Sequence, residues 1–131
     1  MTARPPGRLV LLVDDEADQV EMYQLALEVA GYDVIAAYTG EDGIARARGH
    51  TPDAIVLDVR LPDISGWEVC AVLRADARTE RIPVIILTAA AVPSIAEQAA
   101  DAGCAACLLK PCFPDQLIRT VRDVIAAQPQ V

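Results

Sequence analysis

Short apolar runs alternate strictly with helical patterns along this 131-residue chain, and this alternation constrains its fold more than any other feature. The apolar runs lie at residues 9–13, 33–37, 54–57, 83–87 and 106–109. Apolar residues at helical spacing appear near 17–30, 41–48, 66–75, 94–102 and 115–127. Because the short runs are apolar throughout, we expect strands that are buried on both faces. The pattern predicts an α/β fold of five parallel strands joined by five helices.

Such an arrangement is typical of the doubly wound, flavodoxin-like sheet. The usual strand order of that fold is 2-1-3-4-5, and we adopt it here because periodicity alone does not supply an order. No internal repeat or linker interrupts residues 9–127, so we expect one domain over that range. Residues 1–8 are expected to form a flexible N-terminal arm, and residues 128–131 a tail or the start of a linker.

Residues typical of helix ends support these boundaries. Gly31 and Gly103 follow the first and fourth helical patterns, where a glycine commonly ends a helix. Thr39 and Asp42 resemble a capping box at the start of the second pattern. Pro114 lies near the first turn of the fifth, where proline is tolerated.

Polar residues follow four of the five predicted strands. They are, in chain order, Asp14, Asp15, Glu16, Asp58, Thr88 and Lys110. With the order 2-1-3-4-5, the four strands lie side by side, and ligands bind at their carboxyl ends in such sheets. Each residue alone could be a helix cap, a turn residue or a solvated charge. Because all of them fall at the same end of successive strands, we predict a single site.

The chemistry of this set favours a metal ion and a phosphoryl group. Carboxylates crowded at the edge of a buried strand repel one another, and a divalent cation offsets that repulsion. Carboxylate oxygens suit Mg²⁺, and Mn²⁺ is an alternative. A carboxylate can also act as a nucleophile and form an aspartyl-phosphate, while a hydroxyl and an ammonium group neutralise the transferred charge. Lys110 is the only lysine beside ten arginines, and it lies where a compact charge suits this chemistry.

Net charge and hydropathy exclude other classes of function. The formal net charge of −8 disfavours direct binding of nucleic acid. The longest apolar runs have about five residues, too few to span a membrane, and residues 1–8 lack the apolar segment of a signal peptide. We therefore expect a cytoplasmic protein without a membrane partner.

The four cysteines raise the question of whether the chain holds a zinc site. Cys104 and Cys107 form a C-x-x-C pair, but a zinc site would need Cys70 or His50 as a ligand distant in sequence. We favour the alternative, in which these cysteines and Cys112 are small, reduced, partly buried thiols.

Five segments together resemble the receiver domain of two-component response regulators, of the chemotaxis-regulator type, over residues 9–127. They are "LLVDDE", "PDAIVLDVRLPDISGWEV", "IPVIILTA", "DAGC" and "LLKP", in the family's order and spacing. The resemblance implies that Asp58 accepts a phosphoryl group from the phosphohistidine of a sensor histidine kinase or a phosphotransfer protein. Thr88 and Lys110 would then hold the phosphoryl oxygens, and the Lys110–Pro111 peptide bond is expected to be cis.

The same resemblance implies a set of metal ligands. Asp15, Asp58 and the backbone carbonyl of Arg60 would bind Mg²⁺ directly, and Asp14 would act mainly through water. Glu16 is expected to be a surface or helix-start acid rather than a ligand. The implied partners further include a downstream protein or output domain, and the implied state is a monomer or a weak, phosphorylation-dependent dimer.

The chain departs from the family at several positions. Cys107 replaces the aromatic residue that usually moves when the conserved threonine is drawn to the phosphate, so the usual form of this switch is absent or replaced. Cys112 and Phe113 stand after Lys-Pro, where a phenylalanine and a capping residue are expected. Arg60 and Ala90 occupy the two positions that tune access of hydrolytic water. Switching of the face formed by helix 94–102, strand 106–109 and helix 115–127 is therefore in question.

Two other classes of function are open to test. A receiver-like scaffold would signal through protein contacts without phosphorylation, which the missing aromatic residue favours. A phosphatase of the haloacid dehalogenase type would need a D-x-D motif, whereas the chain has Asp14-Asp15-Glu16, and neither a dinucleotide nor a P-loop motif is present. The resemblance implies that the domain catalyses its own phosphorylation and dephosphorylation only and is not a turnover enzyme.

Overall fold

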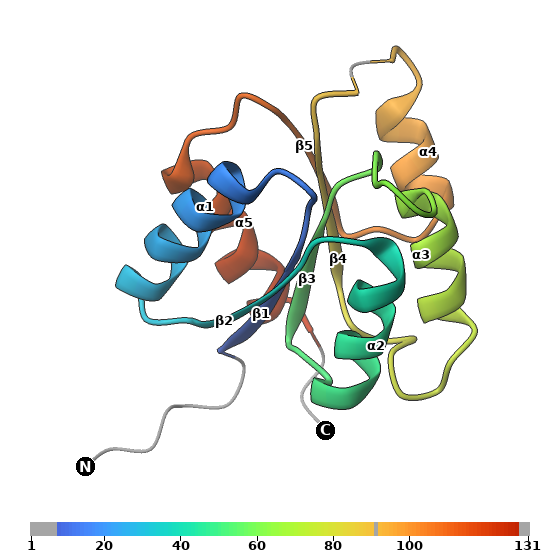
Figure 1. Cartoon of the computed structure of the whole chain (residues 1–131), viewed down its shortest axis with the longest axis horizontal. Helices are drawn as coiled ribbons and strands as arrows, with labels where there is room; N and C mark the ends of the chain where they lie inside the picture. The colour runs from blue at the N-terminus through green and yellow to red at the C-terminus, as the bar shows by residue number, and fades with distance from the viewer. Residues whose placement is uncertain (1–7, 91, 129–131) are drawn as a thin grey trace.

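A parallel β-sheet lies at the centre of the computed structural model, which describes residues 8–90 and 92–128 (Figure 1). The elements in chain order are β1 (Leu9–Val13), α1 (Ala17–Val29), β2 (Asp33–Ala37), α2 (Gly40–His50), β3 (Ala54–Leu57), α3 (Gly66–Arg74), β4 (Val84–Thr88), α4 (Ile95–Asp101), β5 (Ala106–Leu109) and α5 (Pro114–Ala126). Within the described ranges the sheet has five strands in the order β2-β1-β3-β4-β5, and neighbours pair in parallel. The predicted fold class and strand order are confirmed.

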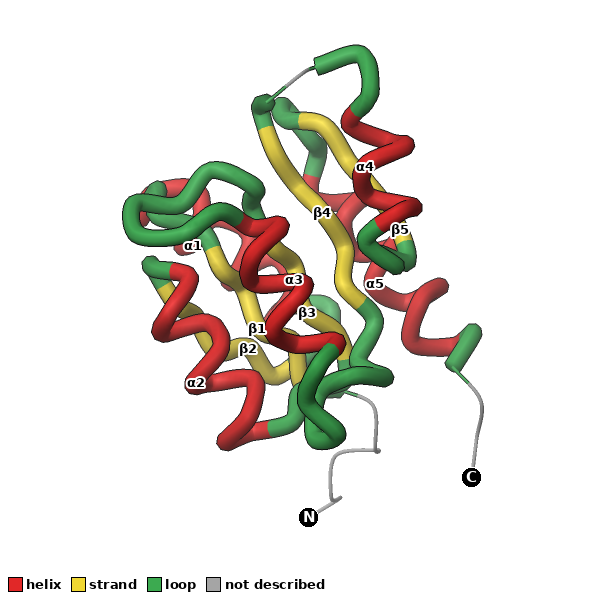
Figure 2. Tube along the Cα trace, turned by 90° about the vertical axis from the view of Figure 1, so that its right-hand side faces the viewer, coloured by secondary structure: helices red, strands yellow, loops and turns green. Residues whose placement is uncertain are grey.

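Helices cover both faces of the sheet, which explains why the strands are apolar throughout. Helices α2, α3 and α4 lie on one face and α1 and α5 on the other (Figures 1 and 2). Along β1, Leu11 and Val13 belong to the core under α2 and α3, whereas Val10 and Leu12 belong to the core under α1 and α5. Successive strand residues thus fill opposite cores.

The predicted helix ends agree with the observed caps. Gly31 and Gly103 follow the last residues of α1 and α4 by two positions and have φ of +103° and +79°, a conformation that side chains with a Cβ rarely adopt. Thr39 caps α2, and its side chain accepts a hydrogen bond of 3.1 Å from the backbone N–H of Asp42. Pro114 is the first residue of α5.

One strand boundary differs from the prediction. The fourth strand covers Val84–Thr88 rather than 83–87, so Thr88 lies inside the strand and not after it. Pro83 has no N–H to donate to the ladder, and the backbone N–H of Lys110 bonds to the Thr88 carbonyl at 2.9 Å, which extends the pairing of β4 with β5 by one residue.

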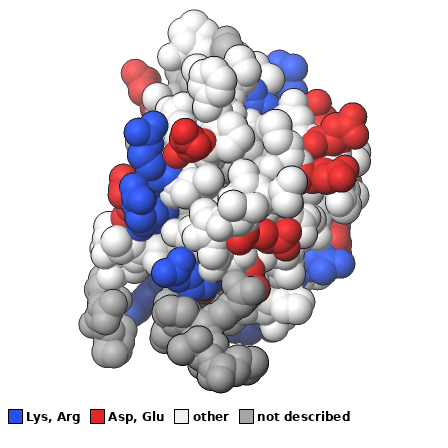
Figure 3. All heavy atoms as spheres, turned by 90° about the vertical axis from the view of Figure 1, so that its left-hand side faces the viewer, with Lys and Arg blue, Asp and Glu red and all other residues white. Residues whose placement is uncertain are grey.

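The α1 and α5 side of the molecule carries a broad uncharged area with charged groups around it (Figure 3). Large apolar side chains are exposed on α1, at Met22, Leu25 and Val29, and before α5, where Phe113 is 82% exposed. No helix within residues 8–90 and 92–128 is long and apolar enough to cross a bilayer. Most of the predicted arm and tail lies outside the described residues, and the domain boundaries stay predictions.

Candidate functional site

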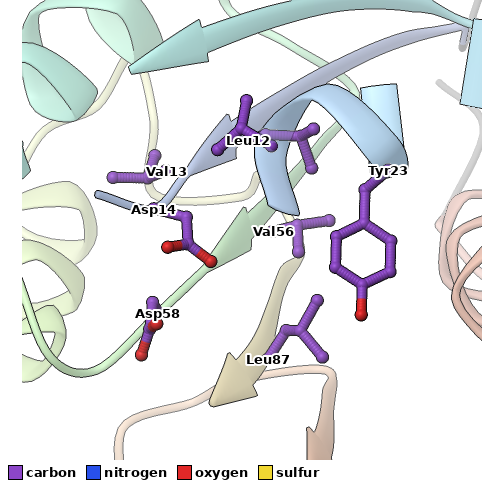
Figure 4. A pocket seen from close by; sticks show the side chains of 8 residues that line it. Leu12, Val13, Asp14, Tyr23, Val56, Asp58 and Leu87 are labelled. Carbon is purple, nitrogen blue, oxygen red and sulfur yellow. The ribbon is translucent and has the colours of Figure 1, made fainter. Parts of the chain in front are cut away.

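Two carboxylates lie side by side beyond the ends of the neighbouring strands β1 and β3 (Figure 4). The backbone N–H of Asp58 donates to the Val13 carbonyl at 3.0 Å, and that of Asp14 donates to the Ala37 carbonyl at 3.0 Å. These bonds continue the sheet by one residue and hold both Cα atoms rigidly. Asp14 and Asp58 are only 7% and 5% exposed, over a crevice of about 10 Å³ whose floor is apolar. Buried carboxylates require compensating charge or hydrogen bonds.

Lys110 supplies that charge from the end of β5. Its Nζ donates to Asp14 Oδ2 at 2.7 Å and to Asp58 Oδ2 at 3.1 Å, and lies 3.5 Å from Glu16 Oε1. The lysine side chain is 5% exposed, so its ammonium group acts in a region of weak solvent screening. The Lys110–Pro111 peptide bond is cis.

The other oxygen of Asp58 is held by uncharged donors. The Thr88 hydroxyl, which is fully buried, donates to Asp58 Oδ1 at 2.8 Å. The backbone N–H of Arg60 donates to the same oxygen at 3.1 Å. Thr88 Oγ1 in turn accepts a hydrogen bond of 3.1 Å from the backbone N–H of Ala90, the first part of the loop that leads to α4. Both oxygens of Asp58 are therefore fixed in direction.

Burial and charge shift the pKa values of Asp14 and Lys110 in opposite directions. Burial raises the pKa of the Asp14 carboxyl, although the hydrogen bonds from Lys110 and the backbone of Glu16 oppose the rise. Burial lowers the pKa of Lys110, but its hydrogen bonds and ion pairs with Asp14 and Asp58 outweigh burial, so that pKa is raised. Lys110 therefore stays charged at neutral pH, and one ammonium group faces three carboxylates.

The surplus of negative charge forms a candidate cation site. One oxygen each of Asp14, Glu16 and Asp58 lies within 4.8 Å of the others. Oxygen ligands at this spacing, two of them from buried residues, suit a hard divalent ion such as Mg²⁺. The donor set therefore fits the implied metal.

The structure places the two acids that follow Asp14 in different surroundings. Glu16, expected to be a helix-start acid, is the N-cap residue of α1, yet its carboxylate reaches towards Lys110 and belongs to the cluster of oxygens. Asp15, expected to be a direct ligand, is exposed and lies outside that cluster. The Lys110 ammonium group, 3.5 Å from Glu16 Oε1, attracts the Glu16 carboxylate towards the cluster. Direct ligation by Asp15 and by the Arg60 carbonyl stays a prediction.

An open cleft of about 230 Å³ gives access to the buried acid Asp58. It is lined by Asp15, Glu16, Asp58, Arg60, Leu61, Pro62, Thr88 and Ala89. The cleft is large enough for a tetrahedral oxyanion, and Asp58 and Thr88 are both among the residues that line it. This arrangement places a fixed carboxylate, a hydroxyl and a nearby ammonium group against an accessible space.

The sequence pattern of the response regulator receiver domain family matches residues 10–122 of the chain. The chain belongs to this family. The polar-differentiation response regulator DivK of Brucella ovis is 33% identical over 116 residues, which cover 88% of this chain and 94% of that protein. The same fold and comparable identity recur among solved structures of response regulators.

Two of these structures are similar over nearly their whole length. A putative response regulator from Chloroflexus aurantiacus is 34% identical, with a TM-score of 0.86, over 91% of this chain and 98% of the other. The chemotaxis response regulator CheY4 of Vibrio cholerae is 30% identical, with a TM-score of 0.83, over 89% and 98%. The receiver domain is thus similar to regulators in both sequence and fold.

Two residues that position the site were not among the site residues predicted from the sequence. Gly66, at the start of α3, packs on the backbone that follows the phosphoacceptor candidate: a Cβ there would lie 2.5 Å from the Asp58 carbonyl oxygen. Asp63 joins the β3–α3 loop to α2, since its two oxygens accept from the backbone N–H groups of Gly40 and Glu41 at 2.8 Å. The sequence indicates these two residues only as a glycine and an acid that follow β3, and neither pattern predicts a role in the site.

The expected switch and tuning positions lie around this site in the receiver domain. Ala90 is buried, and its N–H bonds to Thr88, whereas the Arg60 side chain is exposed at the cleft. Cys107 is half-buried in β5 and packs against the core under α3. Burial raises the pKa of its thiol, so a small neutral group occupies the position of the usual aromatic residue.

The cysteines of the receiver domain do not gather into a zinc site. All four are free thiols. Among the described residues, the cluster of Asp14, Glu16 and Asp58 is the one group of three or more potential ligands at metal-binding spacing. The interpretation of the cysteines as thiols is therefore favoured over a metal centre.

Proposed function

We propose that Asp58 accepts a phosphoryl group from a phosphohistidine of a sensor histidine kinase or phosphotransfer protein, and that this receiver domain acts as a phosphorylation-dependent switch. The observation that carries the proposal is the setting of Asp58, whose two oxygens contact Lys110 on one side and Thr88 on the other beside an open cleft. A fixed carboxylate with such neighbours can attack phosphorus, because the charge that develops is already matched.

The chemistry uses three side chains. One oxygen of Asp58 forms a bond to phosphorus while the bond from phosphorus to the donor nitrogen breaks. Lys110 neutralises the charge that was on the carboxylate and then lies beside the new phosphoryl oxygens. The Thr88 hydroxyl, which donates to Asp58 Oδ1 in the unmodified domain, is free to donate to a phosphoryl oxygen once Asp58 is phosphorylated.

Thr88 connects this event to the rest of the molecule. The Ala90 N–H is bonded to Thr88 Oγ1, so a shift of the hydroxyl also pulls the start of the loop to α4. Phosphorylation would thereby bias the conformation of α4, β5 and α5. That face exposes Val92 and Leu109 by 42% and 47%, and it is the surface that we assign to a downstream protein or output domain.

A divalent cation completes the proposed site. Asp14, Asp58 and either Glu16 or Asp15, with the backbone carbonyl of Arg60, would hold Mg²⁺ or Mn²⁺. When bound, the ion supplies positive charge for the oxygens of the incoming phosphoryl group. Three carboxylates facing one ammonium group support this assignment.

The uncharged area over α1 supports docking of a protein donor beside the cleft. A hollow of about 270 Å³ there is lined mainly by apolar groups, including Met22, Pro111 and Phe113, and also by Lys110 of the phosphorylation site. Continuity between the hollow and the site allows a donor protein to rest on apolar surface while its phosphohistidine reaches Asp58. In this proposal the domain is cytoplasmic, modifies only itself, and is a monomer or a weak phosphorylation-dependent dimer.

Intact mass spectrometry after incubation with Mg²⁺ and acetyl phosphate tests the proposal. We expect the addition of one phosphoryl group to the wild-type chain and none to Asp58→Asn. Asp123→Asn is the matched control, because it makes the same chemical change at an exposed acid of α5 outside the site and should still be labelled. Absence of labelling in the wild type, or labelling that persists in Asp58→Asn, contradicts the assignment.

A scaffold without phosphorylation is the second candidate, and the thiol at Cys107 in place of an aromatic residue is the observation that favours it. The two candidates differ in their dependence on Asp58. Partner binding that is unchanged by Asp58→Ala and by the phosphodonor supports the scaffold, whereas binding that changes with the phosphodonor in the wild type alone supports the switch.

A further inference from the structure

Two cysteine thiols lie in contact on the side of the sheet opposite α1. Cys70, in the middle of α3, is 2% exposed, and Cys104, in the short segment between α4 and β5, is half-buried. Their Sγ atoms are 3.8 Å apart, although the residues are separated by 34 positions in the chain. Both are free thiols. The pair belongs to neither the acidic cluster nor the cleft.

An arginine side chain is fixed close to this pair of cysteines. Arg74, one turn after Cys70, donates from Nη2 to the Gly103 carbonyl at 2.5 Å and from Nη1 to the Glu80 carbonyl at 2.5 Å. These bonds fix the guanidinium group beside the residue that precedes Cys104. A positive charge close to a cysteine stabilises its thiolate, the form that reacts with oxidants.

The two thiols are electrostatically unequal. The hydrogen bond with Cys70 lowers the pKa of Cys104, burial opposes this change, and the charge of Arg74 adds to it. The pKa of Cys70 is raised by the same hydrogen bond and by its burial. Cys104 is thus the more accessible and more easily ionised thiol, and Cys70 is a protonated partner in contact with it.

We propose that Cys70 and Cys104 form a redox modification site, at which a peroxide converts the two thiols into a disulfide that ties α3 to the segment before β5. The inference is independent of phosphorylation at Asp58. It depends on the 3.8 Å contact, on the partial exposure of Cys104 and on the fixed position of Arg74.

The reaction proceeds in two balanced steps. The Cys104 thiolate attacks one peroxide oxygen, so that an S–O bond forms, the O–O bond breaks, and the released hydroxide takes up a proton to become water. The Cys70 sulfur then attacks the sulfur of the Cys104 sulfenic acid. An S–S bond forms, the S–O bond breaks, and the hydroxide that leaves takes the proton of the Cys70 thiol. Two thiols and one hydrogen peroxide thus yield one disulfide and two waters.

The crosslink would enclose the segment that connects the phosphorylation site to α4. The chain between Cys70 and Cys104 contains β4, Thr88, Ala90 and α4. Closing this segment into a covalent loop lowers the entropy of the unfolded chain, so oxidation should raise the melting temperature. The other cysteines have different surroundings: Cys112 packs under α1 and α5 on the opposite face of the sheet.

Peptide mapping of the full chain tests the proposal. Trypsin cleaves after Arg60, Arg74, Arg81 and Arg119, so residues 61–74 carry Cys70 and residues 82–119 carry the other three cysteines. After limited treatment with hydrogen peroxide and without reductant, we expect these two peptides to be joined within a monomer that has lost two hydrogen atoms. The melting temperature should rise and return to its original value with dithiothreitol.

Variants with a single cysteine replaced identify which cysteine of residues 82–119 is linked to Cys70. Cys104→Ser should abolish the link and the shift in melting temperature, whereas Cys107→Ser, a matched change three residues away, should retain both. A link that survives in Cys104→Ser, a link that is lost in Cys107→Ser, or crosslinks only between copies overturns the assignment. Because the wild-type map is read directly, the absence of a 61–74 to 82–119 link in folded, peroxide-treated protein also overturns it, whatever the variants do.

Discussion

At the scale of single residues, the site is built around one carboxylate, Asp58, whose two oxygens both accept hydrogen bonds. Asp58 accepts hydrogen bonds from the Thr88 hydroxyl and the Arg60 backbone N–H on one oxygen and from Lys110 on the other. The same lysine holds Asp14 at 2.7 Å. Lys110 is therefore the residue whose loss should affect both stability and chemistry.

Lys110→Met tests this dual role, because methionine keeps much of the volume and removes the charge. Two buried carboxylates would then face each other without their cation, and we expect the free energy of unfolding to fall by about 3 kcal/mol in the absence of divalent ions. Mg²⁺ should restore part of that loss. Urea unfolding with and without Mg²⁺ measures both effects, and Lys110→Arg, which keeps the charge, is the control. Equal stability of Lys110→Met and wild type without Mg²⁺ contradicts the role of the ion pair.

At the scale of elements, two contacts position the loop between β3 and α3. The first is the close approach of Gly66 to the Asp58 backbone, and the second is the pair of hydrogen bonds from α2 to Asp63. The loop carries Arg60 and the wall of the cleft. Its position therefore depends on α3 on one side and on α2 on the other.

Gly66→Ala should move this loop. The added Cβ would lie 2.5 Å from the Asp58 carbonyl oxygen and 2.8 Å from the Cα of Val59, which are backbone atoms that cannot rotate away. We expect a loss of about 1–3 kcal/mol in unfolding free energy and slower labelling by acetyl phosphate. Gly49→Ala is the control, since no atom lies within 4 Å of the added Cβ, and alanine in α2 should raise stability by about 0.5–1 kcal/mol. Unchanged labelling and stability in Gly66→Ala would show that the contact does not position Asp58.

Asp63 should make stability depend on pH in the acid range. The hydrogen bond from the Glu41 N–H, with further bonds from Gly40 and the loop backbone, lowers the pKa of Asp63 below its ordinary value of 3.8. A lowered pKa in the folded state means that the stabilisation is fully present above pH 3.8 and is lost as the pH falls through the folded value. Asp63→Asn should lower the melting temperature at pH 7, and the difference from wild type should shrink below pH 3.8. A difference that stays constant from pH 7 to pH 3 contradicts this account.

At the scale of the whole molecule, the acidic site and the formal net charge of −8 act in the same direction. Both disfavour the metal-free folded state through repulsion among negative groups. Cation binding to the folded chain alone therefore stabilises it by mass action.

Thermal unfolding measures this linkage. At a Mg²⁺ concentration 100 times the dissociation constant, the expected gain is about 2.7 kcal/mol, and the melting temperature should rise accordingly. Trp67, which packs against the core at the start of α3, should report the same binding by its fluorescence. Asp58→Asn, with one carboxylate fewer, should show a smaller rise. Identical melting with a chelator and with excess Mg²⁺ contradicts the cation site.

Donor docking is also a property of the whole surface. Phe113 is 82% exposed beside the hollow that contains Lys110, and Phe113→Glu would place a charge on that apolar surface. We expect phosphoryl transfer from a protein donor to slow at least tenfold, while labelling by acetyl phosphate stays unchanged. Stopped-flow measurements give the rate of transfer from the protein donor, and intact mass gives the labelling by acetyl phosphate. Val29→Glu, at the far end of α1 and also exposed, is the control. Equal slowing with both donors would indicate damage to the site instead.

The amino-acid sequence by itself determined the elements, the fold class and the set of residues at the strand ends. Burial on two faces requires strands that are apolar throughout, and helix ends need residues such as Gly31 and Thr39, so this information is local. The strand order was adopted from the usual order of the doubly wound fold, and the roles of Asp58 and Lys110 are implied by the resemblance to the receiver family. The end of β4 was misplaced by one residue because it depends on pairing with β5.

Only the tertiary structure decided which side chains meet. Glu16 rather than Asp15 joins the acidic cluster because Lys110, 94 positions away in the chain, attracts it. The contact between Cys70 and Cys104 likewise appears only when α3 and the segment before β5 pack on the same face. The physical reason is the same in each case: these contacts join side chains that are distant in sequence, and the partners come close only after the sheet and its helices have assembled.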